Sequence, residues 1–94
     1  MRLRYAPRAR GDIVHIYQHV AKNNVGAASA VLRQIRATSE LLAEHPALGR
    51  QTDIPGVRVF PIARYPYLVY HKVTQNEVTI VRDGRRGAPR ESDL

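Results

Sequence analysis

The stretch Leu41–Gln51, LLAEHPALGRQ, separates the part of the chain that has a helical pattern from the part that has a strand pattern. Within it, Pro46 cannot continue a helix interior, because proline lacks a backbone N–H and its ring clashes with the preceding turn. Gly49 then marks a turn. We therefore expect the helices to precede this stretch and most of the strands to follow it.

Two amphipathic helices are predicted before the break. In the first, from about Pro7 to Lys22, apolar residues recur with the i, i+3, i+4, i+7 spacing of a single helical stripe. That stripe consists of Ile13, Ile16, Tyr17 and Val20. The second helix is predicted from about Gly26 to Glu44, after a joint that contains two asparagines. Because the joint is short, the two helices should form an antiparallel hairpin.

Four strands are predicted around the helices, from alternation or from a β-branched and aromatic composition. They run over Arg2–Tyr5, Gly56–Ile62, Tyr65–Val73 and Val78–Asp83. The order β-α-α-β-β-β predicts an α+β fold, in which a helical hairpin packs on one face of a small, mostly antiparallel sheet. The first strand must then pair with a later one. We expect a single domain over residues 1–86 and a C-terminal tail over residues 87–94.

Charge is the strongest compositional signal. Of 94 residues, 15 are lysine or arginine and 8 are aspartate or glutamate, which gives a net charge of +7. Only Lys22 and Lys72 are lysines, so the basic residues are mostly arginines. The planar fork of arginine matches carboxylates and phosphates, and the composition therefore indicates acidic protein partners or phosphate-rich partners.

The sequence disfavours several classes of function. It has no cysteine, which excludes disulfides and thiolate metal sites and fits a reducing cytoplasm. No apolar run is long enough to cross a membrane. His15 and His19 have a possible metal spacing, but no third ligand lies near them. We find no glycine-rich phosphate loop, Ser-His-Asp order or paired-carboxylate site, and we expect no cofactor, no metal and no small-molecule substrate.

Four stretches of the chain, in order, resemble the RelE/ParE family of bacterial type II toxins. They are YAPRARGDIVHIYQHVAKNN (Tyr5–Asn24), LLAEHPALGRQ (Leu41–Gln51), PGVRVFPIARYPYLVYHKV (Pro55–Val73) and VTIVRDGRR (Val78–Arg86). The resemblance covers residues 2–86. It implies a toxin that is silenced by a cognate antitoxin, whose C-terminal segment wraps around the toxin.

The family contains two activities. RelE-like toxins cut mRNA on the ribosome, whereas ParE-like toxins poison DNA gyrase and are not nucleases. RNA cleavage needs a group that takes a proton and a cation that holds the phosphate. The candidates on the sheet for these roles are Arg58, Arg64, Tyr70, His71, Arg82 and Arg85. Strand alternation predicts Arg58 on the sheet face away from the core, with His71 near that face.

Asp83 favours the ParE-like activity. Many relatives carry histidine before Gly-Arg-Arg, whereas this chain carries a carboxylate, which lowers the positive potential that an RNA phosphate needs. RelE-like sites also depend on lysine, which is scarce here. We therefore predict a ParE-like toxin that inhibits DNA gyrase by protein contact, and we assign no catalytic residue. A ribosome-dependent mRNA endonuclease and a non-toxic basic binding module are the alternatives.

Two binding surfaces are predicted. Arg82, Arg85 and Arg86, at the end of the last strand, form the predicted target-binding edge, and Asp83 is expected to pair with one of them. The apolar stripe of the first helix forms the predicted antitoxin groove, to which a partner could add a helix or a strand. Because the chain is basic, the antitoxin segment is expected to be acidic.

Overall fold

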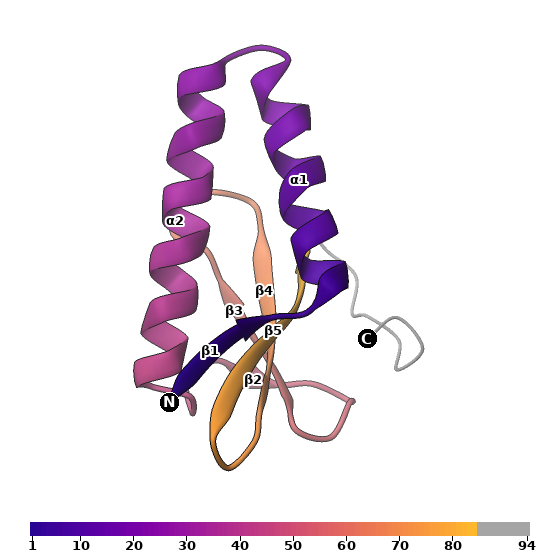
Figure 1. Cartoon of the computed structure of the whole chain (residues 1–94), viewed down its shortest axis with the longest axis vertical. Helices are drawn as coiled ribbons and strands as arrows, with labels where there is room; N and C mark the ends of the chain where they lie inside the picture. The colour runs from indigo at the N-terminus through magenta and orange to yellow at the C-terminus, as the bar shows by residue number, and fades with distance from the viewer. Residues whose placement is uncertain (85–94) are drawn as a thin grey trace.

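A computed structural model of the chain describes residues 1–84. It contains β1 (Arg2–Tyr5), α1 (Pro7–Ala21), α2 (Val25–Glu44), β2 (Arg50–Gln51), β3 (Val57–Pro61), β4 (Leu68–Val73) and β5 (Glu77–Gly84). The strands form one sheet in the order β1-β5-β4-β3-β2. The two helices stand side by side as a hairpin on one face of this sheet (Figure 1). The predicted α+β fold is thus confirmed, with β2 as an additional two-residue strand.

The helix boundaries follow from local chemistry. Pro7 occupies the start of α1, where its fixed φ suits a helix and its missing N–H costs nothing. The side chain of Asn24 caps α2 by accepting a hydrogen bond from the backbone N–H of Ala27 at 2.9 Å. Pro46 follows the end of α2 directly after His45. Neither helix in the described part of the chain is long and apolar enough to cross a membrane.

The first strand pairs with the last. β1 runs parallel to β5, with Leu3 opposite Val78 and Tyr5 opposite Ile80. The other three strand pairs are antiparallel. β5 continues for four residues beyond Ile80, where β1 has already ended and the chain has entered α1. The edge of β5 in this stretch must therefore find other hydrogen-bond partners.

A register shift lies in the same stretch of β5. Tyr70 of β4 is opposite Arg82, but the next residue, His71, is opposite Ile80, so Val81 has no partner of its own. Such a bulge bends a strand and re-aims the side chains next to it. Here it changes the direction of β5 just before Arg82 and Asp83.

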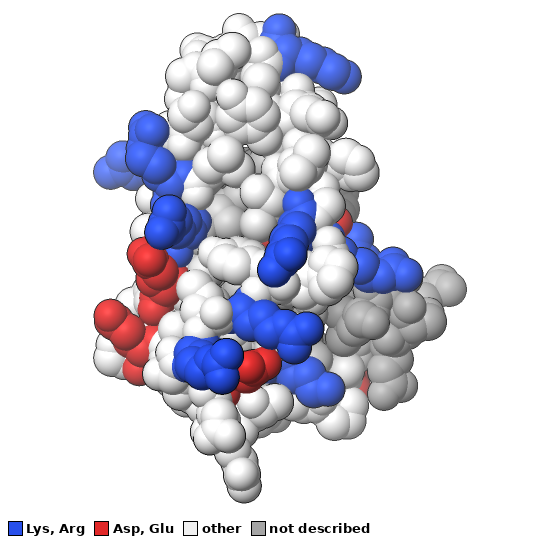
Figure 2. Space-filling model, viewed as in Figure 1, with Lys and Arg blue, Asp and Glu red and all other residues white. Residues whose placement is uncertain are grey.

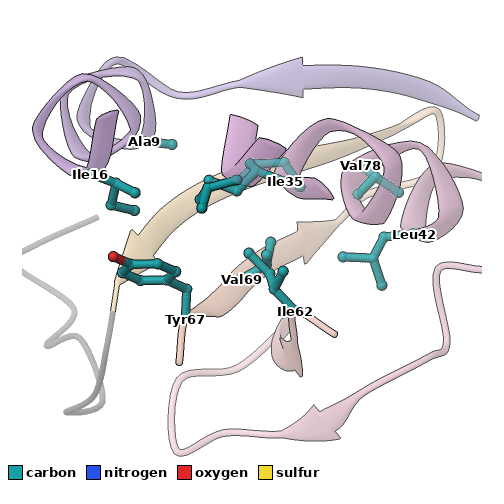
Figure 3. Packing of buried hydrophobic residues seen from close by; sticks show 10 residues of the cluster. Ala9, Ile16, Ile35, Leu42, Ile62, Tyr67, Val69 and Val78 are labelled. Atoms are coloured by element: carbon teal, nitrogen blue, oxygen red, sulfur yellow. The ribbon is translucent and has the colours of Figure 1, made fainter. Parts of the chain in front are cut away.

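The main core lies between the helices and the sheet. Ile35 and Leu42 of α2 are almost completely buried there, and they meet buried residues such as Val69 and Val78 of the sheet (Figure 3). Burial of one such aliphatic side chain contributes about 1.5–3 kcal/mol. The helices pack against β1, β4 and β5.

A second, smaller cluster lies on the other face of the sheet. It is formed by the buried residues Val57, Val59, Tyr70 and Val81. The predicted orientation of β3 is therefore wrong: Val57 and Val59 face away from the helices, and Arg58 faces toward the helix side. Strand alternation correctly predicts that Arg58 lies on the face opposite to Val57 and Val59. It does not predict which of the two faces the helices cover.

Candidate functional site

A carboxylate on α1 ties the end of β5 to the helical hairpin. Asp12 accepts two hydrogen bonds from the guanidinium of Arg82, from Nε at 2.7 Å and from Nη2 at 3.1 Å. Its Oδ2 also accepts the backbone N–H of Asp83 at 3.0 Å. Bidentate ion pairs of this kind are stronger than ordinary hydrogen bonds. Asp12 therefore supplies the partner that β1, which ends at Tyr5, does not provide.

Asp83 is buried without compensation. The residue is 3% exposed, and neither carboxylate oxygen has a hydrogen-bond partner among the described residues. Burial, and to a smaller extent the nearby charge of Asp12, raises the pKa of Asp83 to about 7. The expected pairing of Asp83 with a neighbouring arginine is not found within residues 1–84: Arg82 binds Asp12 instead. We call Asp12, Arg82 and Asp83 the Asp83 site.

His71 lies under the loop that follows α2. It is completely buried, which contradicts the prediction that it lies near an open face. Its Nε2 is 3.3 Å from the carbonyl oxygen of Pro46, and because a carbonyl can only accept, Nε2 carries the proton. Nδ1 is buried without a hydrogen-bond partner. Burial lowers the pKa of His71, and the positive charge of Arg58 adds to this effect.

The same loop is held by Arg58 and by a tight backbone contact. Nη1 of Arg58 donates to the carbonyl oxygen of Gly49 at 3.0 Å. Gly49 has a φ of +91°, and a Cβ at this position would lie 2.6 Å from the carbonyl oxygen of Val59. Only glycine fits such a position. We call His71, Pro46, Gly49 and Arg58 the His71 site.

The remaining candidates for RNA cleavage are scattered. Tyr70 is buried in the cluster on the outer face of the sheet. Arg64 is exposed in the loop between β3 and β4. Arg85 and Arg86, and the predicted tail, lie outside the described residues. The structure thus brings Arg82 to Asp12 and Arg58 to Gly49, and it does not gather the five candidates within residues 1–84 into one site.

The residues of the predicted antitoxin groove are partly used in packing α1 on the sheet. Ile16 is buried in the main core, and Ile13 and Val20 pack against that core. Tyr17 is half-buried. Ile13 and Val20 also line hollows on the surface, and the role of the stripe in antitoxin binding stays a prediction.

A different groove lies between β1 and the helices. Leu3 and Tyr5 of β1 and Ile13 of α1 line one side of it. The residues of α2 that line it are Leu32, Ile35, Arg36 and Glu40. We call this the β1–α2 groove. It combines an apolar floor with one acidic and one basic residue from α2.

The positive charge is concentrated in the first part of the chain. Residues 1–39 contain seven lysines and arginines but a single acidic residue, Asp12, whereas residues 40–84 contain five of each sign. All seven of the basic residues in the first group are exposed. Figure 2 shows basic side chains spread over the helices and the sheet on this face, with acidic side chains near the C-terminal end of α2. This asymmetry is a property of the sequence alone, and the total net charge does not reveal it.

The described residues offer no metal centre. No group of three or more histidine, aspartate or glutamate side chains is close enough to hold an ion in that part of the chain. What the arrangement provides is a basic surface, a groove and an exposed loop, which are features suited to binding another macromolecule.

Comparisons with known proteins agree with this architecture. The chain is 29% identical over 75 residues to a protein of Sinorhizobium fredii (strain NBRC 101917 / NGR234) named "Putative toxin Y4kP", a match that covers 80% of this chain and 78% of the relative. A solved structure described as "Chromosomal ParDE TA system from P. aeruginosa" superposes with a TM-score of 0.81 at 27% identity, over 93% of this chain and 97% of the other. The family model for the ParE toxin of the parDE type II toxin-antitoxin system matches residues 3–87, and the chain therefore belongs to the ParE toxin family.

Proposed function

We propose that this protein is a cytoplasmic toxin that stops growth by inhibiting DNA gyrase through protein contact, and that a cognate antitoxin neutralises it. The observation that carries the proposal is that most polar side chains of the sheet that could act on RNA are not accessible to a substrate. Of the five described candidates for RNA cleavage, four are buried or bound to other parts of the protein.

RNA cleavage through a 2′-hydroxyl needs an accessible proton acceptor close to a free cation. His71 and Tyr70 are buried, so neither can reach a substrate. Arg82 holds Asp12 with two of its nitrogens, and Arg58 holds the carbonyl of Gly49. Among the described candidates only Arg64 is exposed. This arrangement favours binding over nuclease chemistry.

The proposal is tested by measuring supercoiling of relaxed plasmid DNA by purified gyrase. We expect supercoiling to fall as the toxin is added, and to recover when the toxin is first mixed with the antitoxin encoded beside it. An unchanged supercoiling rate at saturating toxin would exclude gyrase as the target. Translation-dependent cuts in mRNA after induction of the toxin would instead support the endonuclease alternative.

For the antitoxin we propose the β1–α2 groove together with the open edge of β1. The backbone N–H groups of Arg2 and Ala6 donate to Asn76 and Ile80 on the β5 side. Successive residues of a strand point their backbone groups to opposite sides, so the intervening Leu3 and Tyr5 present theirs to the open edge. An extended segment of the antitoxin could pair there while its apolar side chains enter the groove.

The charges around this edge favour an acidic partner. Arg2 and Arg4 of β1 are exposed, and Arg36 lines the groove. A second copy of the same chain would bring arginines against arginines at this edge, and like charges placed opposite each other in a sheet are destabilising. The edge therefore disfavours self-pairing and selects an acidic segment.

The groove is tested by charge reversal on α2. Arg36→Glu should weaken antitoxin binding by about tenfold, because it places a negative charge beside an acidic segment. Arg33→Glu is the matched control, since Arg33 is exposed on the same helix but does not line the groove. Equal losses of affinity for both variants, measured by titration calorimetry, would show that general attraction rather than the groove holds the antitoxin.

A further inference from the structure

The turn between β3 and β4 contains a backbone conformation that its sequence does not favour. The N–H of Tyr65 reaches the carbonyl oxygen of Ile62 at 3.4 Å, which closes a four-residue turn. Arg64, the third residue of this turn, has a φ of +73°. A turn with positive φ only at its third residue is of type II, and this position normally holds glycine or asparagine.

Arg64 is an exception within this chain. The other described residues with positive φ are Gly49 and Gly56, where a missing Cβ removes the steric conflict. A bulky L-residue in this conformation is strained. Strained residues persist mainly where the side chain has a function, and the violation of a local rule is therefore a functional signal.

The described fold does not use the side chain of Arg64. The residue is exposed, and no hydrogen bond or ion pair joins its guanidinium to another described residue. The strain is therefore not offset by an internal contact within residues 1–84. A guanidinium that is held out from a turn is available to a partner.

The next two residues belong to a hollow between this turn and the tip of the helical hairpin. Tyr65 and Pro66 line it together with His19, Val20, Asn23, Asn24, Ala27, Val31 and Tyr67. The lining includes aromatic and aliphatic surface but no lysine or arginine. It shares no residue with the β1–α2 groove. Arginine beside tyrosine and a partly apolar hollow is a composition typical of protein–protein hot spots.

We propose that Arg64 contacts the target protein and forms a bidentate ion pair with a carboxylate on the acidic surface of that protein. An apolar side chain of the target enters the neighbouring hollow. This inference rests on the proposed function, inhibition by protein contact. A nucleic acid is the less suitable partner, because a phosphate backbone is held by several cations along a track, and the hollow contributes none.

The test compares three variants with the wild type. Arg64→Asn removes the cation and suits the turn, so its midpoint of thermal unfolding should rise by about 3 °C while its inhibition of gyrase falls by about tenfold or more. Arg64→Lys keeps the charge without the fork and should inhibit to an intermediate extent. Arg33→Gln removes an exposed charge from α2 and should inhibit within about twofold of the wild type.

Affinity for the antitoxin separates a target contact from a general defect. Because Arg64 lies outside the β1–α2 groove, Arg64→Asn should bind the antitoxin within about twofold of the wild-type affinity. The inference is overturned if Arg64→Asn inhibits as well as the wild type, if it is less stable, or if Arg33→Gln loses as much inhibition.

Failure of the gyrase proposal gives a different pattern. If the wild type arrests growth but leaves supercoiling unchanged, gyrase is the wrong target, and growth arrest becomes the measurement for Arg64. Loss of growth arrest in Arg64→Asn then supports the inference, and full retention overturns it. If the wild type does neither, the proposed function and the contact both fail.

Discussion

The His71 site and the Asp83 site both bury an ionisable side chain on the helix-facing side of the sheet, but they treat it in opposite ways. The imidazole of His71 can be neutral at pH 7, and its Nε2–H donates a hydrogen bond to the carbonyl oxygen of Pro46. Asp83 has no donor for either oxygen among the described residues. Burial favours the neutral form of each side chain, so it lowers the pKa of His71 and raises the pKa of Asp83. The two sites should therefore respond to pH in opposite directions.

The largest effect is expected at Asp83. Its pKa rises from 3.8 to about 7 on folding, so the folded state favours the protonated carboxyl. The stability that Asp83 contributes should be complete below about pH 4 and should be lost as the pH rises to about 7, by up to about 4 kcal/mol. Asp83→Asn resembles the protonated form and should flatten this dependence, which urea unfolding at a series of pH values would measure.

The control for this prediction is Asp53→Asn, because Asp53 is exposed. It should leave the pH dependence as it is in the wild type. An Asp83→Asn variant that is less stable than the wild type at pH 8 would contradict the prediction, because it would mean that the ionised carboxylate has a favourable partner.

At the His71 site the next largest effect is expected from Gly49→Ala. The new Cβ would lie 2.6 Å from the carbonyl oxygen of Val59, and the positive φ adds strain, so we expect a loss of about 3 kcal/mol in stability. Gly56→Ala is the matched control, since Gly56 has a φ of +79° but open space around it. It should cost only about 1 kcal/mol. Equal losses would show that the contact with Val59 relaxes freely.

Removal of the Asp12 carboxylate should lower the free energy of unfolding by about 2 kcal/mol. Asp12→Ala removes two hydrogen bonds to the guanidinium of Arg82 and one to the backbone N–H of Asp83. Glu40→Ala breaks the exposed pair between Arg36 and Glu40 and should cost less than about 0.5 kcal/mol. Chemical denaturation of both variants at pH 7 measures the difference, and similar values would mean that the Asp12 pair behaves as a surface ion pair.

The smallest effect is the acid response of His71. Because its folded pKa is below 6.5, the stability that it contributes is complete above pH 6.5 and is lost as the pH falls toward the folded pKa. The Asp83→Asn variant lacks the opposing pH dependence caused by Asp83, so the loss of stability caused by protonation of His71 should become measurable in it. The double variant with His71→Leu should be flatter between pH 4 and 6.5. An identical acid slope in both proteins would contradict the assignment to His71.

The sequence was sufficient for the element order because the helices and long strands have clear periods. The stripe of α1, the asparagine cap of α2 and the break at Pro46 are all local signals. The strand β2 was missed because Arg50–Gln51 is too short to show a period. The face of Arg58 was assigned wrongly because β3 lies beside the part of the sheet that the helices cover, and its outer face carries a cluster of its own.

The candidate site was less predictable because its contacts are non-local. Asp12 and Arg82 are 70 residues apart, and the pair depends on where β1 ends and where β5 bulges. Neither feature has a sequence signal. The sequence shows the charge of Arg82 but does not show that Arg82 forms an ion pair with Asp12. The φ of Arg64 likewise contradicts the residue type, so composition could not have indicated it.

The pairing of the first strand with the last has a consequence for protein synthesis. β1 reaches the rest of the sheet only through β5, which begins at Glu77. A chain released before that residue lacks the strand that joins β1 to β4, and it also lacks Arg82. Contacts between such distant segments form late, after the cost of closing a long loop. Chains truncated before Glu77 should therefore be unfolded, and the sheet should close only after β5 has been synthesised.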